Sequence, residues 1–320
     1  MTMPDPSQAP LSRRVRILVL APFALTGAIF VGAQTGALQQ AIAFFSGEKL
    51  PVKGEPVPAD HGKLSEHNKE WVEKQPPQVQ AEFLLGAAVN HQEGATDLIE
   101  KLVPDWRGHL HRTKVWQDTE MLALYSSDLR VRAAAIEVNL AVNDLAKDPA
   151  SAEQLSQRAE QKQSRPWAEW ELGMLANRGI QTDIIHQQLK IWTHDPDEQT
   201  RLWAVEGLAH IGSSDTIPDF LDVLRNDASH NVRERAGCSL AKSGMLTREQ
   251  RMQAVPGLID LASDSSLDET TNHWVYQALG EITDISLPND PVQWRDWYNH
   301  HGSEQSEKFK RDGESVLGNN

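Results

Sequence analysis

The chain has 320 residues, 39% hydrophobic and 24% charged, which is enough apolar material for one large domain or two ordinary ones. Lys and Arg number 31 against 45 Asp and Glu, and the net charge of −14 argues against nucleic-acid binding, which needs excess cations. The single cysteine, Cys238, excludes an intrachain disulfide and a zinc site built from several thiolates.

The first segment with a clear physical signal is an uncharged run near the N-terminus. Its 31 residues, 17–47, follow three basic residues, Arg13, Arg14 and Arg16. A helix of this length would measure about 46 Å, against about 30 Å for the apolar core of a bilayer. We predict a transmembrane helix at 17–45, with residues 1–16 in the cytoplasm and the rest of the chain outside the cell membrane.

Two alternatives to this anchor remain open. The small residues at 31–33 could serve a signal peptidase, which would leave a secreted protein, and a soluble hairpin is a further possibility. The uncharged run continues through Phe45, well beyond such a cleavage point, and therefore favours the uncleaved anchor.

Small residues recur at every fourth position of this segment, at Ala24, Ala28, Gly32 and Gly36. Such spacing lets two membrane helices approach closely and would support a homodimer. The alternative, which we favour, is that alanine and glycine are simply common in membrane helices.

The segments on either side of the central region differ from it in composition. Residues 46–63 include Pro51, Pro56 and Pro58 and predict an extended stalk. Residues 302–320 are polar and lack periodicity, which predicts a disordered tail. The predicted domain is therefore 64–301.

This domain repeats itself. Five segments, spaced 32 to 39 residues apart, align without gaps: VRAAAIEVNLA from Val131, SRPWAEWELGM from Ser164, TRLWAVEGLAH from Thr200, VRERAGCSLAK from Val232 and TNHWVYQALGE from Thr271. Apolar residues at offsets of three, seven and ten describe one face of a helix, so each copy is predicted to be helical.

A second amphipathic segment precedes several copies, most clearly from Ile184, Ile217 and Ala254. Each repeat is thus predicted to be a helix pair that buries its apolar face by stacking on its neighbours, which gives an all-α, right-handed superhelix. Asp195 and Asp227 lie six residues before Arg201 and Arg233, and we expect each pair to form a charge-assisted hydrogen bond.

The pattern L-x-x-L-x-x-D followed by V-R-x-x-A-x-x-x-L-G resembles HEAT repeats, an armadillo-like helical fold, and in particular the bacterial variety first associated with phycobilisome lyases. The resemblance is best over 182–283, looser over 113–179 and weakest over 76–110. It implies a protein-binding scaffold without catalysis. The alternative that it allows is a lyase or small-ligand-binding protein. Trp294 and Trp297 resemble the cap that closes some bacterial arrays.

One repeat position, two residues after the repeat arginine or its equivalent, carries tryptophan in three of five copies: Ala134, Trp167, Trp203, Arg235 and Trp274. In a HEAT array the second helices line the concave surface, so these residues could form a partner-binding row. The interpretation that we favour is packing between the two helices of each repeat, because large aromatic residues at helical spacing are more often core than contact.

The sequence offers little catalytic chemistry. The histidine pairs, His109 with His111 and His300 with His301, lack metal-site spacing, no phosphate loop or nucleophile elbow occurs, and Cys238 falls on an apolar helix face. We expect no enzyme activity, cofactor or metal. Residues after 47 carry a net charge of −16, so the expected partner is a neutral or basic protein.

Overall fold

The computed structural model describes residues 62–317, with side chains to 313, and these residues belong to the second of two compact units, Asp60–Asn320. The predicted tail 1–16, the transmembrane helix 17–45 with Ala24, Ala28, Gly32 and Gly36, and nearly all of the stalk 46–63 lie outside the described residues. Among the helices that are described, none is both long and apolar enough to cross a membrane.

The described residues form helices and contain no strand beyond one isolated bridge, Lys63 to Glu93. The α-helices are α3 Glu66–Val72, α4 Pro77–Val89, α5 Ala95–Leu102, α6 Lys114–Leu124, α7 Leu129–Val142, α8 Pro149–Ala159, α9 Arg165–Asn177, α10 Thr182–Trp192, α11 Glu198–Ile211, α12 Ile217–Asn226, α13 His230–Cys238, α14 Arg248–Met252, α15 Val255–Ala262, α16 Glu269–Thr283 and α17 Pro291–Leu317. Short 3-10 turns are η1 Val103–Asp105 and η2 Ser214–Thr216, and η3 Ser239–Ser243 is a π turn.

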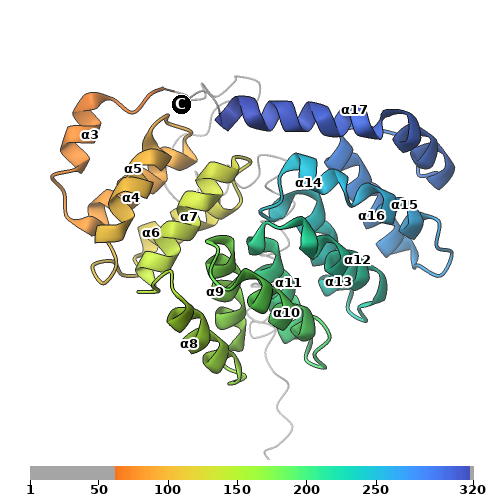
Figure 1. Cartoon of the computed structure of the whole chain (residues 1–320), viewed down its shortest axis with the longest axis horizontal. Coiled ribbons are helices and arrows are strands. Elements are labelled where there is room, and N and C mark those ends of the chain that lie inside the picture. Colours follow the sequence, from red (N-terminus) through yellow and green to blue (C-terminus); the bar gives the residue numbers. More distant parts are fainter. Residues whose placement is uncertain (1–61, 318–320) are drawn as a thin grey trace, which may run out of the picture. The chain divides into compact units, whose positions relative to one another are not determined.

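The helices pair in sequence order and the pairs follow one another along a curved row (Figure 1). All five aligned segments are helical, in α7, α9, α11, α13 with η3, and α16, and their partners are α6, α8, α10, α12 and α15. The prediction of an all-α array of helix pairs is confirmed. One continuous apolar core runs through the pairs, because each pair buries its apolar face against the next.

Aspartates begin several of the second helices. The carboxylates of Asp128, Asp197 and Asp268 accept hydrogen bonds from backbone N–H groups in the first turn of α7, α11 and α16. These donors have no partner within the helix, so an N-terminal carboxylate both satisfies them and complements the helix dipole.

The repeat arginines join neighbouring repeats. Each donates to a carbonyl six residues earlier, Arg165 to Ala159 at 2.6 Å and Arg201 to Asp195 at 3.0 Å. The carboxylate partner of Arg201 is Asp227 of the next repeat, at 2.7 Å from Nε. The predicted hydrogen bonds of Arg201 with Asp195 and of Arg233 with Asp227 are present, and their acceptor is the backbone carbonyl rather than the carboxylate. The rest of each guanidinium reaches forward to a carboxylate of the next repeat.

Helices α9 and α11 approach so closely that their backbones touch. A Cβ added to Gly173 would lie 2.1 Å from the carbonyl oxygen of Gly207, and one added to Gly207 would lie 2.5 Å from the carbonyl oxygen of Glu169. Both positions therefore require glycine.

The C-terminal segment is the main correction to the predicted domains. Residues 302–317, expected to be part of a disordered tail, continue α17, which packs on α14 and α15. Phe309 is buried and its ring lies 3.8 Å from the guanidinium carbon of Arg248, while Trp294 at the start of the helix is 1% exposed. Two buried aromatic residues fifteen positions apart hold the polar helix against the array, which composition alone does not reveal.

Candidate functional site

The three predicted tryptophans are half-buried and have different neighbours. Trp167 packs against the core, with the guanidinium carbon of Arg158 from α8 at 5.4 Å from its ring. Trp274 lies edge-to-face with His230, at 6.1 Å between ring centroids. Trp203 lies one helical turn before Glu206 on α11 and is also half-buried. Packing accounts for Trp167, and whether any of these residues binds a partner stays a prediction.

Arg235, the fourth predicted residue, is 7% exposed and lies at the centre of a contact among three helices. Its Nη2 donates to Glu206 of α11 at 2.5 Å and to the hydroxyl of Tyr125 at 3.2 Å. Burial lowers the pKa of Arg235, but the charge of Glu206 and the hydroxyl of Tyr125 raise it by more, so the guanidinium stays charged. The Arg235–Glu206 pair therefore joins adjacent repeats through a desolvated charge pair.

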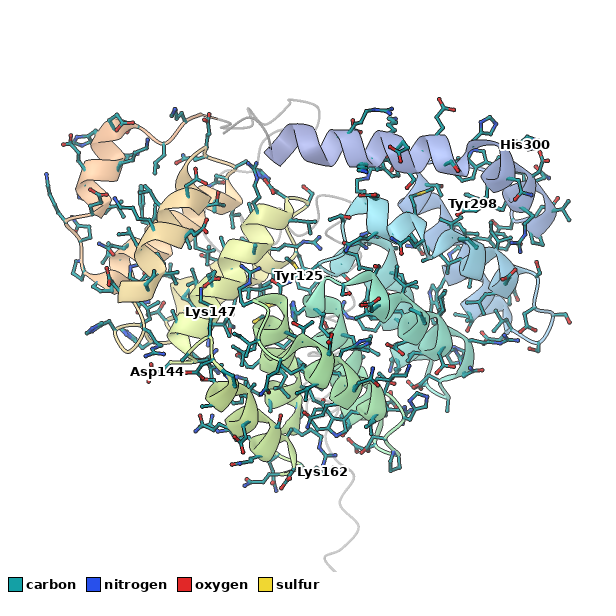
Figure 2. All side chains as sticks on the ribbon, viewed as in Figure 1. Tyr125, Asp144, Lys147, Lys162, Tyr298 and His300 are labelled. Atoms are coloured by element: carbon teal, nitrogen blue, oxygen red, sulfur yellow. The ribbon has the colours of Figure 1, made fainter. Side chains whose placement is uncertain are left out.

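Tyr125 comes from the end of α6, 110 residues before Arg235 in the sequence. In Figure 2 it lies in the middle of the curved row, between the yellow-green helices and the teal ones. Tyr125 is 44% exposed and Met121, one turn earlier on α6, is 48% exposed. We call Met121, Tyr125, Trp203, Glu206 and Arg235 the inner patch. Its α6 members were missed because no repeat pattern indicates that α6 reaches α13.

A second long-range contact lies beside the inner patch. Arg132 of α7 donates to the carbonyls of Gly244, at 2.7 Å, and Lys242, at 2.9 Å. Arg251 donates to the same Gly244 carbonyl at 2.6 Å. The π turn η3 leaves these carbonyls without helical partners, so two buried guanidinium groups satisfy them. Burial lowers the pKa of Arg132 to about 10 and that of Arg251 to about 9.

Two buried carboxyl groups lie between α6, α7 and α9. Asn139 donates to Glu120, and Asn143 donates to Glu171 at 2.7 Å and to the Asn139 side-chain oxygen at 2.9 Å. Arg112 donates to the Asn143 oxygen from the surface side. Burial raises the pKa of Glu120 to about 7 and that of Glu171 well above its ordinary value. We call Glu120, Asn139, Asn143 and Glu171 the polar seam.

Two further titratable groups are buried nearby. Burial raises the pKa of Glu169 to about 9, and neither of its carboxyl oxygens has a hydrogen-bond partner. Burial, together with the charges of Arg235 and Arg132, lowers the pKa of His210 to about 3, and its ring lies edge-to-face with Trp170 at 5.6 Å. At neutral pH both groups are uncharged.

The described part of the chain contains no group of three or more His, Cys, Asp or Glu residues that could hold a metal ion. Cys238 is buried, at 8% exposed, as predicted, and burial raises the pKa of its thiol. His109, His111, His300 and His301 are exposed.

Comparison with known families agrees with this geometry. Residues 186–280, which run from α10 into α16, match the family model described as HEAT repeats. This part of the array is similar to HEAT repeats. HEAT repeats are stacked helix pairs that generally mediate protein–protein interaction. No curated protein matches the chain.

Proposed function

We propose that this protein is a scaffold that binds a partner protein through the inner patch and has no enzymatic activity of its own. The observation that carries the proposal is exposed Tyr125, hydrogen-bonded to the Arg235–Glu206 pair in the middle of a HEAT array, with exposed Met121 one turn away on α6. An exposed aromatic residue and a methionine beside an ordered arginine are the kinds of side chain that dominate protein interfaces.

The charge of the domain supports a neutral or basic partner. Residues after 47 carry −16, and Glu234 on α13 lies within electrostatic reach of Glu206 and Glu281. Burial is the main cause that raises the pKa of Glu234, and the two neighbouring carboxylates raise it further. A lysine or arginine of a partner would lower the free energy of this carboxylate by pairing with it.

The proposed cellular location rests on the sequence. The uncharged run 17–47 after three arginines supports a single-pass anchor with the array outside the cytoplasm, and the small residues at 24, 28, 32 and 36 support a homodimer as a further possibility. Protease added outside intact spheroplasts is expected to digest the array and to spare an N-terminal tag. Protection of both array and tag contradicts the predicted topology.

Affinity capture of the detergent-solubilised full chain tests the binding role. Tyr125→Ala combined with Met121→Ala is expected to lose the co-purifying partner, because truncation removes the exposed apolar part of the inner patch. Ile191→Ala is the matched control, since Ile191 is 71% exposed on the outer helix α10. A doubly substituted chain that stays folded and retains the same partner as wild type contradicts the proposal.

A further inference from the structure

Glu171 of the polar seam stands at a repeat position where the other copies have smaller side chains. Six residues after each repeat arginine or its equivalent stand Val138, Glu171, Gly207, Ser239 and Ala278. In α11 this position lies against the preceding inner helix, since Gly207 touches the backbone of α9. In α9 the same position carries a glutamate whose carboxyl meets Asn143 of α7. The seam is thus a local exception to the packing of the array.

Only one carboxyl oxygen of Glu171 is hydrogen-bonded, and the indole of Trp167 is a further donor nearby. Glu171 is 0% exposed, its Oε1 accepts from Asn143, and its Oε2 is buried without a hydrogen-bond partner. A buried carboxylate with one unpaired oxygen raises the free energy of the folded state. Protonation removes this cost, because it replaces the unpaired negative charge with a neutral O–H group.

The charged groups that face the seam do not neutralise it. Glu120 of α6 repels a charge on Glu171, and Arg112, which attracts it, is an exposed side chain that donates to Asn143 rather than to either carboxyl. The other groups facing Glu171 are uncharged: Asn139 and Asn143 from α7 and the indole of Trp167 from α9 itself.

Arg158 of α8 lies over the ring of Trp167, and Glu137 of α7 pairs with Arg178 at 3.2 Å, so these charges are engaged elsewhere. The seam therefore holds two carboxyl groups with one exposed cation between them and the solvent.

We propose that the polar seam is a proton-controlled joint, in which protonated Glu171 keeps α7 packed against α9 and release of its proton to solvent loosens the joint and separates Tyr125 from Arg235. Hydrogen bonds link the two sites from Glu171 through Asn143 and Asn139 to Glu120, and α6 carries both Glu120 and, at its end, Tyr125 of the inner patch. The raised pKa values of Glu171 and Glu120 agree with this role. The proton-controlled joint does not depend on partner binding, and its test measures no binding.

Cys238 provides a specific readout of opening. It is the single cysteine of the chain, it is buried, and it lies within electrostatic reach of both Arg235 and Tyr125. Its rate of reaction with a dithiodipyridine reagent therefore reports how often α6 separates from α13. Comparing variants at one pH removes the effect of thiol ionisation, which all of them share.

The experiment compares the full chain in detergent with Glu171→Gln and with the surface control Glu153→Gln on α8. At pH 6 we expect the three rates to agree within about twofold, because acid favours the closed joint in all three chains. At pH 9 we expect wild type and Glu153→Gln to react about tenfold faster than Glu171→Gln, because ionised Glu171 destabilises the closed joint and about 1.4 kcal/mol corresponds to tenfold more opening. Equal rates at pH 9 overturn the proposal.

A second measurement covers the case in which Glu171→Gln does not fold at pH 6. In a chain with both Glu169→Gln and Glu120→Gln, which removes the other buried acids of α9 and of the seam, the infrared carbonyl stretch of a protonated carboxyl should be present at pH 7 and should disappear at alkaline pH. Absence of this band at pH 7 overturns the proposal whatever the folding of the first variant.

Discussion

Helix α9 meets α11 through its backbone and meets α7 through hydrogen-bonded polar side chains. At the first junction Gly173 and Gly207 leave no room for a Cβ, and at the second Glu171 fills the equivalent space with a carboxyl group. The first junction is therefore sensitive to side-chain size. The second tolerates a large side chain and depends on its charge. One repeat position can make either kind of joint.

The largest expected effect comes from adding one methyl group to the close junction. Gly173→Ala places a Cβ against the carbonyl oxygen of Gly207, and because backbone cannot move aside as a side chain can, we expect a loss of about 3 kcal/mol or more in unfolding free energy. Urea denaturation measures it. Gly86→Ala in α4 is the control: its Cβ would meet nothing within 4 Å, so it should stabilise by about 0.5–1 kcal/mol. Equal effects at the two glycines would contradict the close junction.

The next effect tests the contact that closes the row from α7 to η3. Arg132→Met removes its hydrogen bonds to the carbonyls of Gly244 and Lys242, and we expect a loss of about 2 kcal/mol because the Lys242 carbonyl loses this donor and that of Gly244 keeps Arg251. Arg130→Met is the neighbouring control, since its ion pair with Asp128 is largely exposed and is worth about 0–1 kcal/mol. A cost for Arg132→Met no greater than that of the control would show that the contact adds no stability.

The pH dependence of the unfolding free energy tests the buried carboxyl groups around α9. The folded-state pKa values of Glu120, about 7, and Glu169, about 9, lie above the ordinary value of 4.5, so the folded chain binds more protons than the unfolded chain. The resulting stability is complete below pH 4.5 and is lost as the pH rises through 7 and then 9, at up to about 1.4 kcal/mol per proton and pH unit. Thermal melts from pH 6 to 10 should show the decline.

Single substitutions assign the two parts of this decline. Glu120→Gln should remove the part of the decline that ends near pH 7, and Glu169→Gln should remove the part that continues to about pH 9. Gly86→Ala should leave the shape of the profile unchanged. A flat wild-type profile would mean that these carboxyls stay ionised in the folded state.

The smallest expected effect concerns the hydroxyl of Tyr125. Tyr125→Phe keeps the ring beside Arg235 and removes one hydrogen bond, which should cost about 1 kcal/mol. In the double variant with Arg132→Met, the loss of unfolding free energy should differ from the sum of the two single losses, because both contacts hold the same helices together. Strict additivity would indicate that the two contacts act separately.

The sequence was sufficient to predict the helices of the repeats, but it did not predict the contacts that join distant repeats. Apolar spacing within the five aligned segments predicted α7, α9, α11, α13 and α16, since each helix buries one face. The contacts of Arg132 and Arg235 span 112 and 110 residues, and no periodic pattern records a meeting of distant repeats. The arginine–aspartate hydrogen bonds within a repeat were predicted, whereas the ion pairs of Arg201 and Arg233 with the next repeat were not, because spacing along the chain does not show which side chains stacking brings together.

Part of the polar seam could have been found in the alignment. Among Val138, Gly207, Ser239 and Ala278, a glutamate at 171 is the one large polar residue, and its helical position predicts burial. Its partner Asn143 ends a helix that the alignment treats as a separate copy. The contact of Asn143 with Glu171 depends on how two repeats stack, which is a property of packing rather than of either segment.

The contact of Arg132 with Gly244 also changes how the array should unfold. Stacked repeats with contacts only between neighbours behave as a one-dimensional chain, in which folding can start anywhere and end repeats fray independently. A contact that joins residues 112 positions apart couples α7 to η3, so the repeats between them gain or lose it together. We expect these repeats to unfold as one cooperative block, and to fold more slowly than an open array of equal length, because a long loop must close before the contact forms.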